Sequence, residues 1–270
     1  ADFLERLAKT PSYHYPAPFA EELRAALAKY VGCQPQEVLV GNGGDEIISL
    51  IMNTFLNPGD TLLTHTPTFD IYGIDAEVLG AKVVTVSDLD GYRRNRDGLL
   101  AKVKELQPKV TVLCNPNNPT GELLPLDYVE SLVQAADTIV VVDEAYLEFA
   151  GAPSIITTLA QYDNLIVIRT LSKAFGLAGC RVGYGVAQKE VIDALGLTKL
   201  VYNLNILSQN AALAAMDYAD EILAHNIPPT LAARQHFMDA LKDVPNLTVY
   251  PSATNFVLVR VPDGPAMVKA

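Results

Sequence analysis

Lys173 is the residue of this chain best placed for covalent chemistry. It follows Ser172 on a loop of small residues, just after an apolar stretch at 165–168 that predicts a buried strand, and Arg181 comes eight positions later. A lysine amine has an ordinary pKa of about 10.4, and burial or a cationic neighbour lowers that pKa and makes the amine a nucleophile toward carbonyl carbons. The same residues also fit a solvated loop lysine with no special role.

A glycine-rich turn separates a short predicted strand (38–40) from an apolar helix that ends near Phe55, and it reads Gly41-Asn-Gly-Gly-Asp-Glu46. Backbone amides at such a helix N-terminus can bind an anion. No Gly-Lys-Ser/Thr follows, which excludes a P-loop, and Glu46 replaces the third small residue of a dinucleotide-binding turn. A site for a single phosphate group and a purely structural turn both remain.

Two further buried strands end in polar residues. The strand predicted at 110–113 is followed by the rigid loop Asn115-Pro-Asn-Asn-Pro-Thr-Gly121, and the apolar strand at 138–142 runs into Asp143-Glu-Ala-Tyr146. An ionised aspartate at the end of a buried strand is costly without a partner. Asp143 therefore predicts a cationic ligand group, an arginine or a metal nearby, and a helix N-cap is the plainer alternative.

These strand ends belong to an alternation of predicted strands and helices from about residue 38 to 185. Such an alternation is typical of an α/β fold in which a mostly parallel sheet has helices on both faces. Ligands bind outside the carboxyl ends of the strands in these sheets. We therefore expect the following candidates to meet on one edge of the sheet: Gly43, Gly44, Phe69, Asn118, Asp143, Tyr146, Ser172 and Lys173.

The C-terminal third of the chain predicts a different pattern. An alanine-rich helix is expected at 208–225, where Pro228-Pro229 would end it, and a helix would resume at 230–241. Strands are predicted at 247–250 and 255–259.

Composition limits the classes of function. The chain has 270 residues, of which 50% are hydrophobic and 19% charged, enough for one large or two ordinary globular domains. The net charge of −11 argues against nucleic acid or an anionic membrane as partner, and no apolar run approaches the ~20 residues that span a bilayer.

The cysteines and histidines predict no metal site. Cys33, Cys114 and Cys180 lack the spacing of a zinc or redox site, and the four histidines form no metal-binding set. We therefore expect reduced cysteines in a cytoplasmic protein.

Taken together, the candidate residues would serve one kind of ligand. A glycine turn, an aromatic face, a buried carboxylate, an amine and an arginine would all be used by a phosphorylated aromatic aldehyde with a basic ring nitrogen. Lys173 would form a Schiff base with the aldehyde, and Asp143 would keep the ring nitrogen protonated. The phosphate would bind the glycine amides, Ser172 and Arg181.

Three motifs, in this order and at this spacing, resemble those of the fold-type I pyridoxal-phosphate-dependent aminotransferases, most of all the histidinol-phosphate aminotransferases among them. They are Asn115-Pro-Asn-Asn-Pro-Thr-Gly121, Val142-Asp-Glu-Ala-Tyr146 and Arg169-Thr-Leu-Ser-Lys-Ala-Phe-Gly-Leu-Ala-Gly-Cys-Arg181. The resemblance extends from Tyr15-Pro16 to residues 251–256. It implies a large cofactor-binding α/β domain and a smaller α+β C-terminal domain.

The resemblance also implies a role for each candidate. Lys173 would carry pyridoxal 5'-phosphate and then move the α-proton of the substrate. Asp143 would pair with the ring nitrogen, and Phe69 would stack on the ring. Asn118 and Tyr146 would hydrogen-bond the ring hydroxyl oxygen. The phosphate region would be held by Gly43 or Gly44, Asp45, Ser172 and Arg181.

Four further residues are given particular roles by the resemblance. Asp45 would have to act through its backbone amide or cap the helix, because a carboxylate repels phosphate. Tyr15 would reach the cofactor phosphate of a neighbouring subunit, which implies a homodimer with shared active sites. Tyr202 and Asn205 would help to shape the substrate pocket.

The resemblance divides the chain into three parts. Residues 1–30 would form an N-terminal arm and helix, 31–206 the large cofactor-binding domain, and 207–270 an interdomain helix with the start of the small domain. Relatives carry a later arginine that binds substrate, and this chain stops at Ala270 before it. We therefore expect an incomplete chain.

The implied reaction moves an amino group between L-histidinol phosphate and 2-oxoglutarate, a step of histidine biosynthesis. Alternatives with the same cofactor are a threonine-phosphate decarboxylase-like enzyme and an aminotransferase for aromatic or other amino acids. Glu46 disfavours a nicotinamide-dependent oxidoreductase. A non-catalytic binding protein is a further alternative, and it would require that the natural protein also lacks the C-terminal motif.

Overall fold

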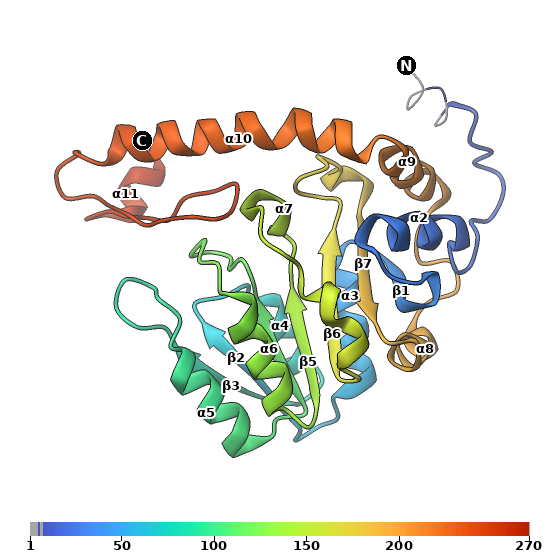
Figure 1. Ribbon diagram of the computed structural model, residues 1–270, viewed down its shortest axis with the longest axis horizontal. Helices are drawn as coiled ribbons and strands as arrows, with labels where there is room; N and C mark the ends of the chain where they lie inside the picture. The colour runs from blue at the N-terminus through green and yellow to red at the C-terminus, as the bar shows by residue number, and fades with distance from the viewer. Residues whose placement is uncertain (1–4, 6–7, 270) are drawn as a thin grey trace.

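The computed structural model describes residues 5 and 8–269, and a seven-stranded sheet forms its centre (Figure 1). Its strands are β1 (Val38–Asn42), β2 (Thr61–Thr66), β3 (Lys82–Ser87), β4 (Val110–Cys114), β5 (Ile139–Asp143), β6 (Leu165–Thr170) and β7 (Val182–Ala187). They lie in the order β1-β7-β6-β5-β4-β2-β3. β2 to β6 pair in parallel, whereas β7 is antiparallel to both β1 and β6. The predicted mostly parallel α/β sheet is therefore confirmed.

The central strands are apolar at most positions because helices cover both faces of the sheet. β4 and β6 are buried along their whole length, and β5 is buried at every position after its first. A strand buried on both faces has no solvent side that would favour alternating polar residues. This accounts for the mostly apolar composition of β4, β5 and β6 before their polar ends.

The covering helices divide into two layers (Figure 1). One core, which includes Ile51, Tyr72 and Leu195, joins the sheet to α3 (Gly44–Phe55), α4 (Ile71–Val78) and α8 (Lys189–Thr198). The other core joins the opposite face to α2 (Glu21–Val31), α5 (Arg96–Leu106), α6 (Leu126–Ala135) and α9 (Ile206–Asp217).

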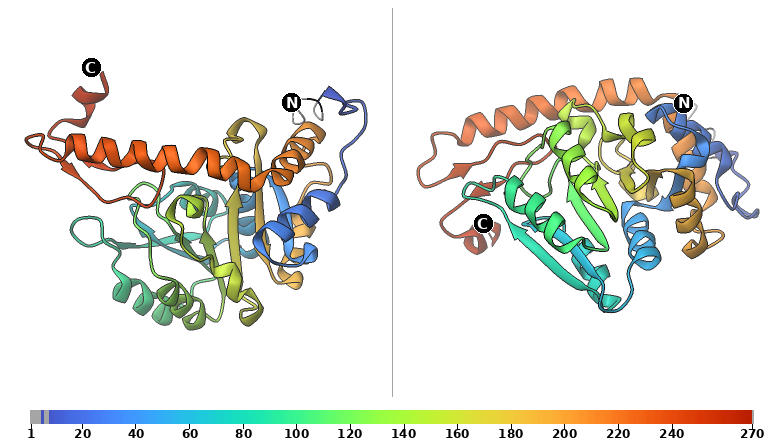
Figure 2. Two further views of the ribbon diagram at one scale, coloured as in Figure 1. Left: turned by 45° about the horizontal axis from the view of Figure 1, so that its top comes forward. Right: turned by 60° about the horizontal axis from the view of Figure 1, so that its bottom comes forward.

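A long helix, α10 (Ala219–Leu241), crosses the end of the sheet toward which β5 and β6 point (Figures 1 and 2). The predicted break at Pro228-Pro229 is wrong, because both prolines lie inside α10 and the chain turns at Tyr218 instead. The carbonyls that lose their donors to the prolines belong to Ala224 and His225. Both residues are exposed, so solvent can replace the lost bonds.

The segment after α10 forms shorter strands than predicted. β8 (Thr248–Val249) pairs antiparallel with β9 (Val259–Arg260), and α11 (Gly264–Lys269) follows. Between them the hydroxyls of Ser252 and Thr254 accept hydrogen bonds from the backbone N–H groups two residues later. Such local bonds compete with sheet pairing, which accounts for the short strands. No helix within residues 5 and 8–269 is both long and apolar enough to cross a membrane.

Candidate active site

A cavity of about 160 Å³ lies at the carboxyl ends of the parallel strands. Residues from several of these ends line it together with the start of α3 and the connection between β6 and β7. The structure brings these predicted candidates to one cavity: Gly44, Asp45, Phe69, Asn118, Asp143, Tyr146, Ser172, Lys173 and Arg181.

Asp143 is the buried charge of the cavity. It ends β5 and is 5% exposed; its Oδ2 accepts a hydrogen bond from the Tyr72 hydroxyl at 2.6 Å, and its Oδ1 accepts one from the Ala145 N–H at 3.0 Å. Burial raises the pKa of Asp143, and these two hydrogen bonds act in the opposite direction. Both partners are neutral, so the carboxylate can still receive a cationic group.

Tyr72 is a residue of this cavity that sequence reasoning missed. It lies in α4, is fully buried and lines the cavity. Burial, and then the nearby Asp143, raise the pKa of Tyr72 well above its ordinary value. The available signal was a tyrosine in the first turn of the helix that follows Phe69, but its contact with Asp143 depends on how α4 packs on the sheet.

Aromatic rings form two walls of the cavity. Phe69 meets Tyr72 edge to face, with ring centroids 5.7 Å apart. Tyr146 meets Phe256 in the same way at 5.2 Å, and the Lys173 Nζ atom lies 5.4 Å from the centroid of the Tyr146 ring. Burial raises the pKa of Tyr146 to about 12, so its hydroxyl keeps its proton near neutral pH and can donate a hydrogen bond.

Lys173 and Ser172 lie on the connection between β6 and β7. The Thr170 hydroxyl donates to the Ser172 Oγ at 3.0 Å and accepts from the Ser172 N–H at 3.1 Å. The Asn226 side chain, from α10, donates to the Ala174 carbonyl at 2.9 Å. The loop is therefore fixed on both sides of Lys173, whose own side chain is exposed.

Arg181 and Asp45 form an ion pair of 2.8 Å at the open side of the cavity. Of the two roles predicted for Asp45, the helix cap is not observed, because the N-cap of α3 is Gly43 and the Asp45 carboxylate bonds Arg181. An arginine satisfies the carboxylate better than the amides of its own helix, since its charge is opposite.

The glycine turn leaves room for the Arg181 guanidinium. Gly43 has φ 88°, and a Cβ on it would lie 2.4 Å from Arg181 Nη2. A Cβ on Gly183, in β7, would lie 2.4 Å from the Gly43 carbonyl carbon. The N-cap of α3 is Gly43, which has no side chain that could cap the helix. Its first amides can therefore receive an anion next to the guanidinium.

The remaining candidates do not line this cavity. The Tyr15 ring is 79% exposed and stacks on Tyr202, with centroids 4.6 Å apart. Asn205 caps α9, and its Oδ1 accepts from the Ser208 N–H at 2.9 Å. Gly43 is not a lining residue and lies beside the Arg181 guanidinium.

The described part of the chain, residues 5 and 8–269, holds no group of three or more side chains suited to a metal ion. Its cysteines are free thiols; Cys114 is buried, and Cys33 and Cys180 are half-buried. Burial, the largest cause, raises the pKa of Cys114 to about 12, so this thiol beside the cavity stays protonated.

Comparison with known proteins gives consistent relationships. Residues 3–270 match the family model of class I and II aminotransferases. A histidinol-phosphate aminotransferase from Thermoanaerobacter sp. (strain X514) is 43% identical over 249 residues, which are 92% of this chain and 70% of that protein.

Solved structures extend these relationships to the fold. The crystal structure of histidinol-phosphate aminotransferase from Sinorhizobium meliloti in complex with pyridoxal-5'-phosphate has a TM-score of 0.90 at 29% identity, over 99% of this chain and 74% of that one. L-threonine-O-3-phosphate decarboxylase from Porphyromonas gingivalis has a TM-score of 0.85 at 26% identity, over 98% of this chain and 80% of that one.

Proposed function

Because this chain belongs to the class I and II aminotransferases, we propose that it moves an amino group between L-histidinol phosphate and 2-oxoglutarate with pyridoxal 5'-phosphate as cofactor. The meeting of an amine, a buried carboxylate and an arginine beside a glycine turn carries this proposal for the cofactor. The names of relatives that are 38–43% identical support the substrate.

The residues around the cavity fit pyridoxal phosphate. Asp143 is a buried carboxylate with neutral hydrogen-bond partners, so a protonated ring nitrogen would supply a counter-charge in direct contact with it. Phe69 offers a ring face, and the amides at the start of α3 with Arg181 offer an anion site. When bound, the cofactor supplies an electron sink that stabilises negative charge on the α-carbon of the substrate.

The side chains would divide the remaining work. Lys173 would hold the cofactor through its Nζ atom and would take the proton from the substrate α-carbon. Tyr146 and Asn118 would bond the ring hydroxyl oxygen, and the high pKa of Tyr146 keeps it a donor. Ser172, Gly43 or Gly44 and Arg181 would hold the phosphate, and Asp45 would keep Arg181 oriented until the phosphate replaces it.

We also propose a homodimer in which Tyr15 completes the partner's site. Tyr15 and Tyr13 lie on the arm with side chains 79% and 85% exposed, and Lys199 fixes the arm through the Pro18 carbonyl at 3.0 Å. An arm with exposed aromatic rings and a fixed base suits contact with a second copy. The three-part domain division, the substrate roles of Tyr202 and Asn205, and a cytoplasmic location complete the proposal.

One absorbance experiment tests the cofactor. The purified protein with pyridoxal phosphate should show the visible absorbance of the lysine-bound cofactor, and Lys173→Ala should lose it. Lys189→Ala is the matched control, because Lys189 is an exposed helix lysine paired with Asp193. Visible absorbance in Lys173→Ala equal to that of the control would contradict the assignment of Lys173.

Activity assays test the substrate separately. The protein should transfer the amino group of L-histidinol phosphate to 2-oxoglutarate faster than it acts on threonine phosphate or phenylalanine. The relationship to threonine-phosphate decarboxylase makes threonine phosphate the informative competitor. Faster release of carbon dioxide from threonine phosphate would replace the proposed substrate without affecting the cofactor.

A further inference from the structure

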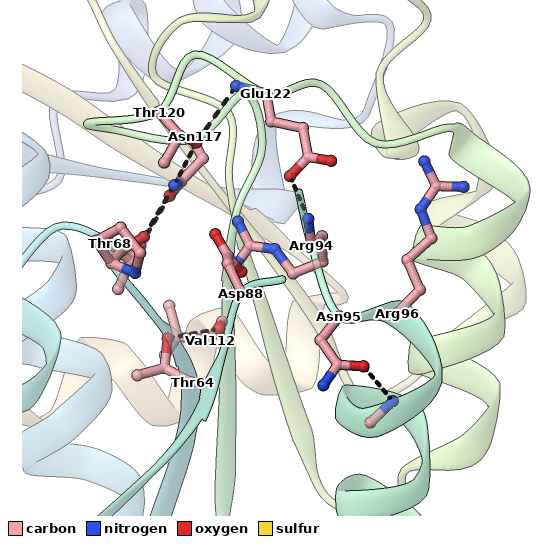
Figure 3. A network of polar contacts seen from close by, with 12 residues as sticks. Thr64, Thr68, Asp88, Arg94, Asn95, Arg96, Val112, Asn117, Thr120 and Glu122 are labelled. Atoms are coloured by element: carbon pink, nitrogen blue, oxygen red, sulfur yellow. Dashed lines mark hydrogen bonds and ion pairs between the residues drawn. The ribbon is translucent and has the colours of Figure 1, made fainter. Parts of the chain in front are cut away.

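Asn117 precedes a candidate cofactor ligand, but its side chain bonds residues outside the cavity lining. It is 0% exposed and does not line the cavity, unlike its neighbour Asn118. Its Oδ1 accepts a hydrogen bond from the Thr68 hydroxyl at 2.9 Å, and its Nδ2 donates to the Pro67 carbonyl at 3.0 Å and to Thr120 Oγ1 at 2.8 Å (Figure 3). The whole side-chain amide is therefore used inside the protein.

The chemistry of these partners requires an asparagine amide. A proline carbonyl can only accept, so it fixes which end of the Asn117 amide faces Pro67. The oxygen then faces Thr68, whose hydroxyl can donate. An aspartate would place a second acceptor against the Pro67 carbonyl and leave that buried carbonyl without its donor.

Asn117 joins two segments that each contribute a residue to the cavity lining. Thr68 directly precedes Phe69 in the segment after β2, and Asn117 directly precedes Asn118 in the segment after β4. Asn118 lines the cavity and directly follows Asn117, so the backbone held at Asn117 sets its position. The spacing between Phe69 and Asn118 thus depends on the bonds that Asn117 makes to Thr68 and to Pro67.

The far end of the Asn118 loop is anchored independently. The Glu122 Oε2 accepts from the Arg94 N–H at 2.8 Å, and the Arg94 side chain forms a buried ion pair with Asp88 at 3.3 Å (Figure 3). The Ala253 N–H donates to the Gly121 carbonyl at 2.8 Å. A loop held at its far end responds to loss of the Thr68 bond by shifting near Asn118, not by unfolding as a whole.

We propose that Asn117 is a positioning residue. It would set the distance between Phe69 and Asn118 so that Phe69 stacks on the face of the cofactor ring while Asn118 bonds the hydroxyl oxygen at its edge. The inference rests on the proposed cofactor and adds to it a residue that touches neither cofactor nor substrate. It assigns to Asn117 and Thr68 an effect on how the ring is bound and on how its hydroxyl oxygen is hydrogen-bonded.

The test compares three hydroxyl variants. Thr68→Val removes the donor to Asn117 and keeps the side-chain shape, whereas Thr68→Ser keeps the donor. Thr64→Val is the matched control. Thr64 is 3% exposed, and its hydroxyl donates to the Val112 carbonyl at 3.0 Å (Figure 3). Thr64 does not line the cavity. All three keep the candidate ligands of the cofactor intact.

The readouts are pyridoxal phosphate affinity, the pH midpoint of the visible absorbance of the lysine-bound cofactor, and the thermal midpoint of the protein without cofactor. Thr68→Val should weaken affinity about tenfold and shift the pH midpoint, because a misplaced Asn118 no longer bonds the ring oxygen well. Thr68→Ser should restore both. Thr64→Val should lower only the thermal midpoint.

Two different results would distinguish an incorrect role for Asn117 from an incorrect cofactor. A Thr68→Val protein that melts earlier but keeps wild-type affinity and pH midpoint would show that Asn117 only supports the fold, and would overturn the inference. A wild-type protein that does not bind pyridoxal phosphate would instead overturn the proposed cofactor.

Discussion

On one side of the cavity, Asp143 is 5% exposed and is held by Tyr72 and Ala145, whereas on the other side Asp45 and Arg181 pair with side chains 57% and 44% exposed. The buried side is fixed by hydrogen bonds to neutral groups, and water does not screen its charge. The exposed pair is screened and contributes about 0–1 kcal/mol. A phosphate can therefore replace Asp45 at Arg181 at little cost, while Asp143 has to be matched by its ligand.

The largest expected effect comes from neutralising the buried carboxylate. Asp143→Asn keeps an oxygen for Tyr72 but removes the charge that would hold a protonated ring nitrogen. We expect kcat to fall by about 10²- to 10³-fold in steady-state assays of transamination. A kcat of Asp143→Asn within about threefold of wild type would contradict the proposed difference between the buried Asp143 and the exposed pair of Asp45 and Arg181.

Removing the arginine of the exposed side should have a smaller effect, mainly on binding. Arg181→Ala should weaken pyridoxal phosphate affinity by roughly 10- to 100-fold, because a charge-assisted bond to the phosphate is lost. Spectrophotometric titration of the cofactor-free protein measures this affinity. Arg181→Lys should lie between wild type and Arg181→Ala, since lysine keeps the charge and loses the planar fork.

The pH dependence of cofactor binding should report the buried side. Burial raises the pKa of Asp143, and below that pKa the carboxyl group is neutral and no longer attracts the protonated ring nitrogen. Affinity should therefore fall as the pH falls through the raised pKa, by about tenfold per unit of pH below it. Titrations of Asp143→Asn at the same pH values should lack this component, and an equal slope in both proteins would assign it to other groups.

The smallest effect is expected for the same substitution on the exposed side. Asp45→Asn should change cofactor affinity by less than about threefold and the free energy of unfolding by less than about 1 kcal/mol. Urea unfolding and cofactor titration measure the two quantities. A loss comparable with that of Asp143→Asn would mean that Asp45 contacts the ligand instead of only orienting Arg181.

Local patterns predicted much of the fold and the placement of most candidates. Apolar runs that end in Asp143 or in the Asn115–Gly121 loop predicted strand ends, because burial on both faces and turn chemistry leave signals within a few residues. Membership of the class I and II aminotransferases agrees with the resemblance of the three motifs. The parallel sheet then brought those strand ends to one cavity.

Contacts between distant segments were not predictable in the same way. The bond from Tyr72 to Asp143 spans 71 positions and depends on how α4 packs. The pairing of Asp45 with Arg181 spans 136 positions and takes the place of a helix cap, one of the two roles that local reasoning left open for Asp45. The prolines of α10 misled the prediction because solvent access, which the sequence does not display, decides whether a helix tolerates them.

The antiparallel pairing of β6 and β7 limits the length of a ligand that can contact both Lys173 and Arg181. Lys173 and Arg181 stand on the single connection between these neighbouring strands, and Gly183 lets β7 begin against the Gly43 carbonyl carbon. The distance between the Lys173 amine and the Arg181 guanidinium is thus set by one stretch of backbone whose two ends are fixed by the paired strands. One residue added between Ala174 and Cys180 would change the distance between amine and guanidinium, whereas one residue added to the turn at 88–95 would leave that distance unchanged.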